Sequence, residues 1–286
     1  MRARGYRVRV ALAWQGERCD ALIALHARRS HESIVRFSET GKPLVVTLTG
    51  TDLYRDLPDS AEARRSLELA DRVIVLQEAA LDSLDARTRG KTRVVYQSAD
   101  PRTPHRPPKN VFQIAVIAHL RSEKDPLRAV AALHRLSDGN LRLLQIGSAL
   151  DPVLGEEART WAEREPRYRW LGAVPHARAL AWLARSHLLV VSSVMEGGAN
   201  VIAEAARIGT PVIASRVPGN LGMLGARYPG YYPLADDKAL AHLLEQAMRD
   251  RAFYAGLKRA LRERRKLFAP AAERAALAGV VGEVLH

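Results

Sequence analysis

The sequence predicts an α/β protein made of two lobes, each built around a parallel β-sheet. Short apolar runs rich in Val, Ile and Leu alternate with longer segments of helical periodicity. The apolar runs are nearly continuous rather than alternating, which is typical of parallel strands covered on both faces. A proline-rich stretch near the middle of the chain divides these elements into two sets.

Each set contains several expected strands. In the first set they lie at Val8–Ala13, Ala21–Leu25, Leu44–Thr49, Val73–Leu76 and Val94–Tyr96. In the second set they lie at Ile114–Ala118, Leu141–Ile146, Leu188–Ser192 and Val212–Ala214. Helices are expected between the strands, among others at Ala61–Leu69, Pro126–Leu136 and Ala177–Ala184. This alternation of strand and helix favours parallel sheets.

The boundary between the lobes is predicted at the proline-rich stretch. Ala99–Asn110 contains four prolines and little apolar sequence, so we expect an extended, semi-rigid linker. Residues 1–110 then form an N-terminal domain ending in this linker, and residues 111–286 form a C-terminal domain. The cleft between two such lobes is a natural ligand site.

Composition excludes several classes of protein. Of the 286 residues 47% are hydrophobic and 26% charged, and no apolar run approaches the roughly 20 residues that a membrane span needs. A single cysteine, Cys19, rules out an internal disulfide and a cysteine-based metal site. The arginines near the start are not followed by an apolar run and a cleavage site, so we expect no signal peptide and a cytoplasmic location.

The formal net charge of +13 favours anionic partners. Aromatic residues are few, at 6%, and no nucleic-acid-binding module is recognisable, so we expect no nucleic-acid partner. The densest basic stretch, Lys258–Lys266, lies on a predicted helix. It could touch a membrane surface, but we prefer a plain exposed helix face and expect no membrane association.

The most informative stretch follows the predicted strand Leu188–Ser192. A loop, Glu196–Asn200, precedes a helix predicted from Val201 to Ile208, with Asn200 as its N-cap and a stop at Gly209. Glycines in this loop let the backbone approach a ligand, and the unpaired N–H groups of a helix N-terminus suit a phosphate.

Two carboxylates flank this helix start. Glu196 lies on the loop and Glu204 about one turn into the helix, and both can face one cleft. There a carboxylate accepts hydrogen bonds from sugar or ribose hydroxyls. The alternative is a pair of surface carboxylates near a helix start, where acidic residues are favoured.

The loop, the two glutamates and the closing segment Gly209–Ser215 resemble the donor signature of retaining GT-B glycosyltransferases. The resemblance implies two Rossmann-like domains whose parallel sheets face across a cleft. It implies that Glu196 contacts the sugar as a catalytic residue and that Glu204 binds the ribose. The donor-binding loop would be formed by Gly197, Gly198, Ala199 and Asn200.

A second element, Ala118–Pro126, resembles the family loop whose arginine and lysine clamp the donor diphosphate. Lys124 matches the lysine, and a cation there offsets charge on the leaving nucleotide without a metal. His119 stands where the family has its arginine, and Arg121 follows two residues on. Either can supply the second diphosphate contact. Beyond the UDP-sugar substrate, no cofactor and no metal are expected.

The acceptor side is expected in the first lobe. His26 ends a predicted strand, where the family often has a histidine near the reacting sugar, which implies a catalytic role. Thr49–Tyr54 resembles the family's His-Gly-x-Asp turn. Gly50 would permit close approach of a ligand, and Thr51 and Asp52 would offer a hydroxyl and a carboxylate. The alternative is a capped turn in which Asp52 opens a helix.

Members of the family normally begin with a strand, a glycine-rich loop and a long helix. The resemblance does not include these elements, so we expect an apparently truncated first domain.

Further strings resemble a narrower family, the selenosugar synthases of selenoneine biosynthesis. They are Ala24–Ser30, Leu48–Asp56, Pro166–Gly172, Met195–Ile202 and Arg216–Gly225. The resemblance implies transfer of a sugar from UDP-N-acetylglucosamine or UDP-glucose to selenophosphate, giving a 1-seleno sugar. It also implies a pathway link to a selenophosphate synthetase.

Selenophosphate is a small anion, so the acceptor lobe should present cations. Arg28 and Arg29 are the candidates, unless they are two arginines on an exposed helix start. Two other functions stay open at this point. One is a peripheral-membrane glycosyltransferase acting on a lipid or polysaccharide, and the other is a non-catalytic nucleotide-sugar-binding protein.

Overall fold

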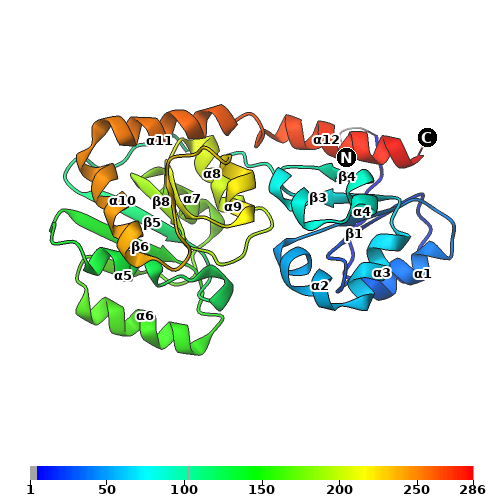
Figure 1. The fold of residues 1–286 in the computed structure, drawn as a ribbon, viewed down its shortest axis with the longest axis horizontal. Coiled ribbons are helices and arrows are strands. Elements are labelled where there is room, and N and C mark those ends of the chain that lie inside the picture. The colour runs from blue at the N-terminus through cyan, green and yellow to red at the C-terminus, as the bar shows by residue number, and fades with distance from the viewer. Residues whose placement is uncertain (1–4, 102, 286) are drawn as a thin grey trace. The chain divides into compact units, whose positions relative to one another are not determined.

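The structure, a computed structural model, describes residues 5–101 and 103–285. The chain divides into two compact units, which are described separately (Figure 1). Unit 1 consists of the described residues of Met1–Ser98, Glu196–Gly198 and Ala269–His286. Unit 2 consists of those of Ala99–Met195 and Ala199–Phe268.

Unit 1 is built on a four-stranded parallel sheet with the order β1-β2-β3-β4. The strands are β1 (Leu22–Leu25), β2 (Leu44–Thr47), β3 (Arg72–Val75) and β4 (Thr92–Val94). The helical segments are α1 (His31–Ser38), η2 (Asp52–Asp56), α2 (Leu57–Asp59), α3 (Ala61–Leu69), η3 (Glu78–Ser83), α4 (Ala86–Gly90) and α12 (Pro270–Leu285).

The two faces of this sheet are covered by different parts of the chain. On one face, strand residues pack with helices α1 and α3 in a cluster that includes Val46, Val73, Val75, Ile34, Phe37 and Leu67. On the other face, a separate cluster joins β2, β3 and α12 through Val45, Ile74 and Val280. Right-handed crossovers between consecutive parallel strands place the connecting helices on one face, so the other face needs a helix from elsewhere. The C-terminal helix α12 provides it.

This packing differs from the predicted domain limits, which placed the chain's last residues in the second domain. The Glu283 carboxylate of α12 also accepts hydrogen bonds from two guanidinium groups of the sheet, at 2.8 Å from Arg72 Nε and 3.0 Å from Arg93 Nε. Sequence patterns cannot reveal this docking, because the contacts join residues about 190 to 210 positions apart.

The strand predicted at Val8–Ala13 is wrong, since this segment has no regular secondary structure. Its apolar side chains are exposed, with Val10 at 87% and Leu12 at 108%. A strand needs a hydrogen-bonding neighbour, and no pairing joins this segment to the described strands.

Unit 2 is built on a six-stranded parallel sheet with the order β10-β9-β8-β5-β6-β7. The strands are β5 (Phe112–Ile117), β6 (Leu141–Ile146), β7 (Tyr168–Trp170), β8 (Leu188–Val191), β9 (Val212–Ser215) and β10 (Tyr231–Tyr232). The helical segments are η4 (Ser122–Lys124), α5 (Arg128–His134), α6 (Pro152–Arg164), α7 (His176–Ala184), α8 (Asn200–Ile208), α9 (Pro218–Leu224), α10 (Asp237–Arg249) and α11 (Arg251–Arg264). The short edge strands β7 and β10 were not predicted from the sequence.

In unit 2, the order in which the chain adds strands to the sheet changes side between β5 and β8, although all strands are parallel. From β5 the chain builds outward through β6 and β7, and from β8 it builds the other way through β9 and β10. Ligands of such sheets bind in the crevice outside the carboxyl ends of the strands at this switch point. The loops that follow β5 and β8 are therefore the ones that bear on function.

The proline-rich stretch packs against unit 2, in the part of it that the structure describes. The Arg106 N–H donates to the Ala184 carbonyl at 2.8 Å, and the His105 ring nitrogen Nε2 lies 2.9 Å from the Ser186 carbonyl oxygen. Both partners lie at or just beyond the end of α7. The predicted extended segment is thus anchored on unit 2 at these two residues.

Candidate functional site

The loops after β5 and β8 are joined at the switch point of unit 2. The Ser192 hydroxyl donates to the Lys124 carbonyl at 3.0 Å, and the Val194 N–H donates to the Glu123 carbonyl at 2.9 Å. Asp125, which follows η4, has a φ of 40° and turns the chain toward α5. These bonds hold Lys124, which is half-buried, at the carboxyl edge of the sheet.

The loop after β9 is tied to the same edge. The Ser215 hydroxyl donates to the Ser193 carbonyl at 2.6 Å, and the Asn220 amide donates to the Ser215 carbonyl at 2.9 Å. Three successive strand ends are therefore fixed to one another before any ligand arrives. A site assembled this way costs little reorganisation on binding.

Helix α8 begins at Asn200 and ends at Gly209, whose φ of 100° confirms the predicted stop. Asn200 is not the N-cap, because it is the first helical residue and Ala199, which is buried, precedes the helix without a side-chain cap. Instead the Asn200 amide nitrogen donates to Glu204 Oε1 at 3.1 Å. The asparagine thus orients the glutamate one turn along the helix.

Glu204 has a second partner, which the sequence reasoning missed. His176, the first residue of α7, places Nε2 at 2.7 Å from Glu204 Oε1. The carboxylate is 8% exposed and the histidine side chain 71%. Both bonds fall on Oε1, and within the described part of the chain Oε2 makes no hydrogen bond, so it is left for a ligand. The only signal in the sequence was a histidine directly before a predicted helix.

The two candidates for the second diphosphate contact differ in their surroundings. The exposed His119 ring accepts a hydrogen bond through Nδ1 from the Ser148 N–H, at 3.1 Å. This bond links the loops after β5 and β6. Arg121 is exposed, and its guanidinium makes no hydrogen bond or ion pair among the described residues. Arg121 is therefore the better placed of the two for an anion.

The loop Glu196–Gly198 belongs to unit 1, where it packs against the turn after β2. A Cβ built on Gly50 would lie 2.6 Å from the Gly197 nitrogen, and one built on Gly198 would lie 2.6 Å from the Leu76 Cβ. Gly50 and Gly197 are required because their backbones lie against each other, and Gly198 because it lies against Leu76. These contacts require glycine whether or not a ligand also approaches the loop. Glu196 is buried, with 7% exposure.

The turn after β2 is organised by Asp52, which is fully buried. Its Oδ1 accepts hydrogen bonds from the Thr49 N–H at 2.6 Å and the Thr49 hydroxyl at 2.7 Å, and its Oδ2 accepts one from the Ala27 N–H at 2.9 Å. The carboxylate predicted for the acceptor cleft thus joins the ends of β1 and β2. Asp52 also opens the helical turn η2, as the alternative reading of this turn expected.

His26 lies beside this carboxylate and has a φ of 74°, an unusual value for a residue other than glycine. The Arg29 N–H donates to Nδ1 at 3.3 Å, so in the neutral ring Nε2 carries the proton and faces the Thr51 hydroxyl at 3.1 Å. Burial lowers the pKa of His26 below its ordinary value, which outweighs the opposing charge of Asp52. The neutral ring is therefore the form present near pH 7.

The two arginines after His26 differ in their pairing. Arg28, 56% exposed, places NH1 3.4 Å from Asp56 Oδ1. Arg29 is exposed, and its guanidinium makes no hydrogen bond or ion pair among the described residues. Arg29 thus offers a cation at the start of the first helix of unit 1.

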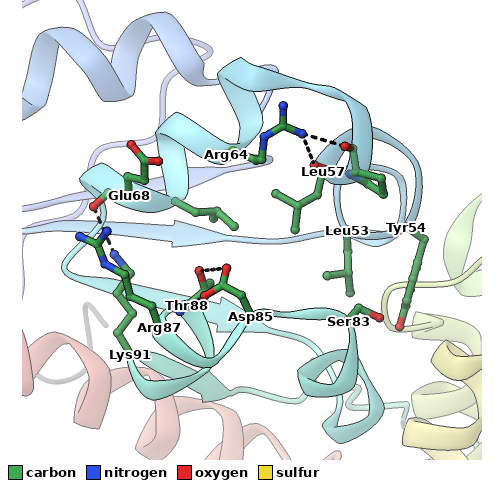
Figure 2. Close-up of a pocket in the computed structure, with 12 residues that line it drawn as sticks. Leu53, Tyr54, Leu57, Arg64, Glu68, Ser83, Asp85, Arg87, Thr88 and Lys91 are labelled. Atoms are coloured by element: carbon green, nitrogen blue, oxygen red, sulfur yellow. Dashed lines mark hydrogen bonds between the residues drawn. The ribbon is translucent and has the colours of Figure 1, made fainter.

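A pocket of about 620 Å³ lies elsewhere in unit 1, between α3 on one side and η3 and α4 on the other (Figure 2). None of the predicted site residues lines it. Its polar groups are largely bonded to the protein itself: Arg64 donates to the Leu57 and Pro58 carbonyls, and Lys91 donates to the Ala70 and Glu68 carbonyls. Although this pocket is large, its cations already bond to the protein and none of the predicted site residues lines it, so we do not assign the sugar donor to it.

Within residues 5–101 and 103–285, no three His, Cys, Asp or Glu side chains gather in a group that could hold a metal ion. No helix in the same ranges is long and apolar enough to cross a membrane.

Solved structures share this fold. Anabaena Alr3699/HepE, in complex with UDP and glucose, matches with a TM-score of 0.77 and 19% identity, over 92% of this chain and 77% of that one. Sucrose-phosphate synthase from Thermosynechococcus elongatus matches with a TM-score of 0.75 and 21% identity, over 92% and 73%. Together with the two parallel sheets, these similarities define a pair of Rossmann-like α/β domains of the GT-B kind.

The family follows from the sequence of the second half. Residues 98–266, more than half of the chain, match the model of the glycosyl transferases group 1 family. The chain belongs to this family. The match includes Lys124, the start of α8 and Glu204, and therefore spans the switch point of unit 2.

Curated relatives agree with this assignment. The D-inositol 3-phosphate glycosyltransferase of Corynebacterium glutamicum is 31% identical over 229 residues, covering 67% of this chain and 55% of that protein. The glycosyltransferase 1 domain-containing protein 1 of Xenopus tropicalis is 33% identical over 112 residues, covering 38% and 32%. The chain thus spans between about a third and just over half of these relatives.

Proposed function

We propose that this protein is a glycosyltransferase that takes its sugar from a UDP-sugar, UDP-N-acetylglucosamine or UDP-glucose, and transfers it to selenophosphate. The observation that supports a UDP-sugar as the donor is the arrangement of groups at the switch point of unit 2. The Lys124 loop, the start of α8 and the Glu204 carboxylate meet at one edge of the sheet. The complex of the Anabaena protein with UDP and glucose supports this donor class.

Each group of this edge matches one part of the donor. A lysine and a helix N-terminus suit the diphosphate, because both offer N–H donors and positive charge. Glu204 Oε2 suits a ribose hydroxyl, which can donate to a carboxylate. Arg121 is the proposed second cation for the diphosphate, and Glu196 the proposed contact to the sugar.

The reaction then proceeds by displacement at the anomeric carbon. Selenium bonds to C1 of the sugar as the bond from C1 to the UDP oxygen breaks, and water cleaves the selenium–phosphorus bond to release phosphate and the 1-seleno sugar. The charge that grows on UDP is offset by Lys124. Selenium is a strong nucleophile and needs little help from a general base, which is consistent with a neutral, hydrogen-bonded His26.

The acceptor half rests on the resemblance to selenosugar synthases and on the charge of unit 1. In the described part of the chain, the guanidinium of Arg29 has no ion-pair partner. The guanidinium of Arg28 lies near Asp56, a carboxylate that Arg55 also approaches. A small dianion such as selenophosphate would be held by such groups. A selenophosphate synthetase would supply the acceptor.

The test incubates the protein with selenophosphate and a panel of UDP-sugars, and follows selenium-bearing sugars by mass spectrometry together with phosphate release. We expect one such sugar from wild type and none from Glu196→Gln. Arg29→Gln should raise the KM for selenophosphate and leave the KM for the UDP-sugar unchanged.

Two outcomes would overturn parts of the proposal. Transfer to a carbohydrate or lipid acceptor, with none to selenophosphate, would refute the acceptor. Tight binding of UDP-sugars by calorimetry with no turnover on any acceptor would show a binding protein instead of an enzyme.

A further inference from the structure

A second pocket, of about 240 Å³, lies in unit 2 at the opposite end of α8 from Asn200. Its floor includes Ile208 and Gly209, where α8 ends. Its walls come from α11, from the chain just beyond that helix and from the segment around His105. The residues of the proposed donor site do not line it.

The walls carry three full positive charges and no negative one. Lys258, Arg262 and Arg265 line the pocket, and no aspartate or glutamate does. Lys258 and Arg262, four residues apart, lie on one face of α11, and Arg265 follows directly after the helix. None of the three forms an ion pair with the acidic residues that the structure describes. The basic stretch noted in the sequence is therefore partly gathered around a cavity.

Such an arrangement is electrostatically unfavourable when the pocket holds only water. Like charges four residues apart, such as Lys258 and Arg262, repel each other and destabilise a helix. The carboxyl end of α8 offsets only part of this, because the end of a helix carries roughly half a negative charge. Against three cations, this leaves a surplus of positive charge in the pocket.

His105 completes the wall without adding a charge near pH 7. A carbonyl oxygen can only accept, so the ring donates from Nε2 to Ser186 at 2.9 Å. Burial lowers the pKa of His105, and the neighbouring Lys258 lowers it further. The hydrogen bond to Ser186 holds the ring as a fixed wall opposite α11.

We propose that this pocket binds a phosphate group, carried by inorganic phosphate, a soluble phosphomonoester or a lipid headgroup. A phosphate presents several strong acceptors and up to two negative charges, and guanidinium groups bind it with paired N–H donors. A pocket of this volume accommodates a phosphate group with water. Neither donor binding nor glycosyl transfer requires this pocket, so it stands independently of the proposed function.

The first experiment titrates the full chain with inorganic phosphate by calorimetry at constant ionic strength, which keeps general screening equal. We expect saturable binding in wild type. The double variant Lys258→Gln/Arg262→Gln should bind about ten-fold more weakly or worse, because each charged hydrogen bond is lost. Arg259→Gln, on the same helix but outside the pocket, is the matched control and should bind as wild type does.

A second variant separates this pocket from the donor site. Lys124→Gln should weaken UDP binding and leave phosphate binding at the α11 pocket intact. Loss of phosphate binding in Lys124→Gln, or an equal loss in Arg259→Gln, would overturn the proposal. Absence of saturable phosphate binding in a folded wild type, checked by circular dichroism, would overturn it as well.

Vesicles identify the source of the phosphate. Phosphatidylcholine vesicles with and without phosphatidic acid, whose headgroup is a phosphomonoester, are sedimented with wild type and the double variant. Binding that requires both phosphatidic acid and the two cations assigns the pocket to a lipid headgroup. Binding of inorganic phosphate without binding of these vesicles assigns it to a soluble phosphate.

Discussion

Each unit has a histidine beside a carboxylate among its candidate site groups, His26 in unit 1 and His176 in unit 2, and the two differ in burial. In unit 1, the His26 side chain is 7% exposed and its neighbours Asp52 and Asp56 are 0% and 6% exposed. In unit 2, the carboxylate of Glu204 is 8% exposed but its partner His176 is 71% exposed. A histidine and its carboxylate neighbours thus form a buried network in unit 1, whereas in unit 2 the histidine of the pair is open to solvent.

The hydrogen bonds of Asp52 and Glu204 indicate what each carboxylate can do. Asp52 uses both oxygens on N–H and hydroxyl donors of the protein, which holds two loops together. Glu204 receives both of its bonds on one oxygen, which orients the carboxylate and leaves the other oxygen for a ligand. We therefore expect Asp52 to determine stability and Glu204 to determine binding.

The largest effect that tests this difference is expected for Asp52→Ala. The variant leaves three donors unpaired in a fully buried position, so the free energy of unfolding should fall by about 3 kcal/mol or more. Urea denaturation followed by circular dichroism measures it. Asp59→Ala, an exposed residue of α2, is the control and should change little. A wild-type midpoint for Asp52→Ala would contradict the structural role.

The second effect is expected for Glu204→Ala. Affinity for UDP should fall about 10- to 100-fold, since a hydrogen bond to a charged group contributes about 1.5–3 kcal/mol. The urea midpoint should stay close to that of wild type, in contrast to Asp52→Ala. Calorimetry with UDP measures the affinity, with the exposed Glu157→Ala as control. Unchanged affinity would remove Glu204 from the donor site.

A smaller effect is expected for His176→Ala, because the histidine acts only through Glu204. The KM for the UDP-sugar should rise several-fold, as one hydrogen bond contributes about 1 kcal/mol, with kcat little changed. His176→Gln, which can still donate, should recover part of the loss. Steady-state kinetics on these two variants and on His242→Ala, an exposed histidine of α10, measure it. Equal KM values in all would show that Glu204 needs no such support.

The smallest effect concerns acid sensitivity. Because burial lowers the pKa of His26, the unfolded chain takes up its proton first as the pH falls below about 6.5. The stability that the neutral ring contributes is present above this pH and is lost as the pH falls through the lowered pKa. His26→Asn, which tolerates a positive φ, should make the unfolding free energy less dependent on pH between about 7 and 5. If His26→Asn left the pH dependence of the unfolding free energy unchanged, the pKa of His26 would not be lowered in the folded protein.

Much of the architecture was predictable because it depends on local patterns. The helix Ala61–Leu69 and the strand Leu141–Ile146 agree with the structure residue for residue. Buried strands of a parallel sheet are continuous apolar runs, and Gly209 terminates α8 because glycine adopts a positive φ at little cost. The short edge strands β7 and β10 carried no such run and were missed.

The family and the end of α8 at Gly209 were predictable from the sequence, since the signals for both lie within contiguous stretches of chain. The hydrogen bonds of the carboxylates became visible only in the folded chain: those of Asp52 occupy both of its oxygens, and those of Glu204 only one. The tertiary structure also decided that α12 covers the sheet of unit 1, that His176 supports Glu204, and that the basic face of α11 meets the end of α8 around a cavity. These contacts join residues far apart in the chain, and burial and charge pairing arise only when packing brings them together.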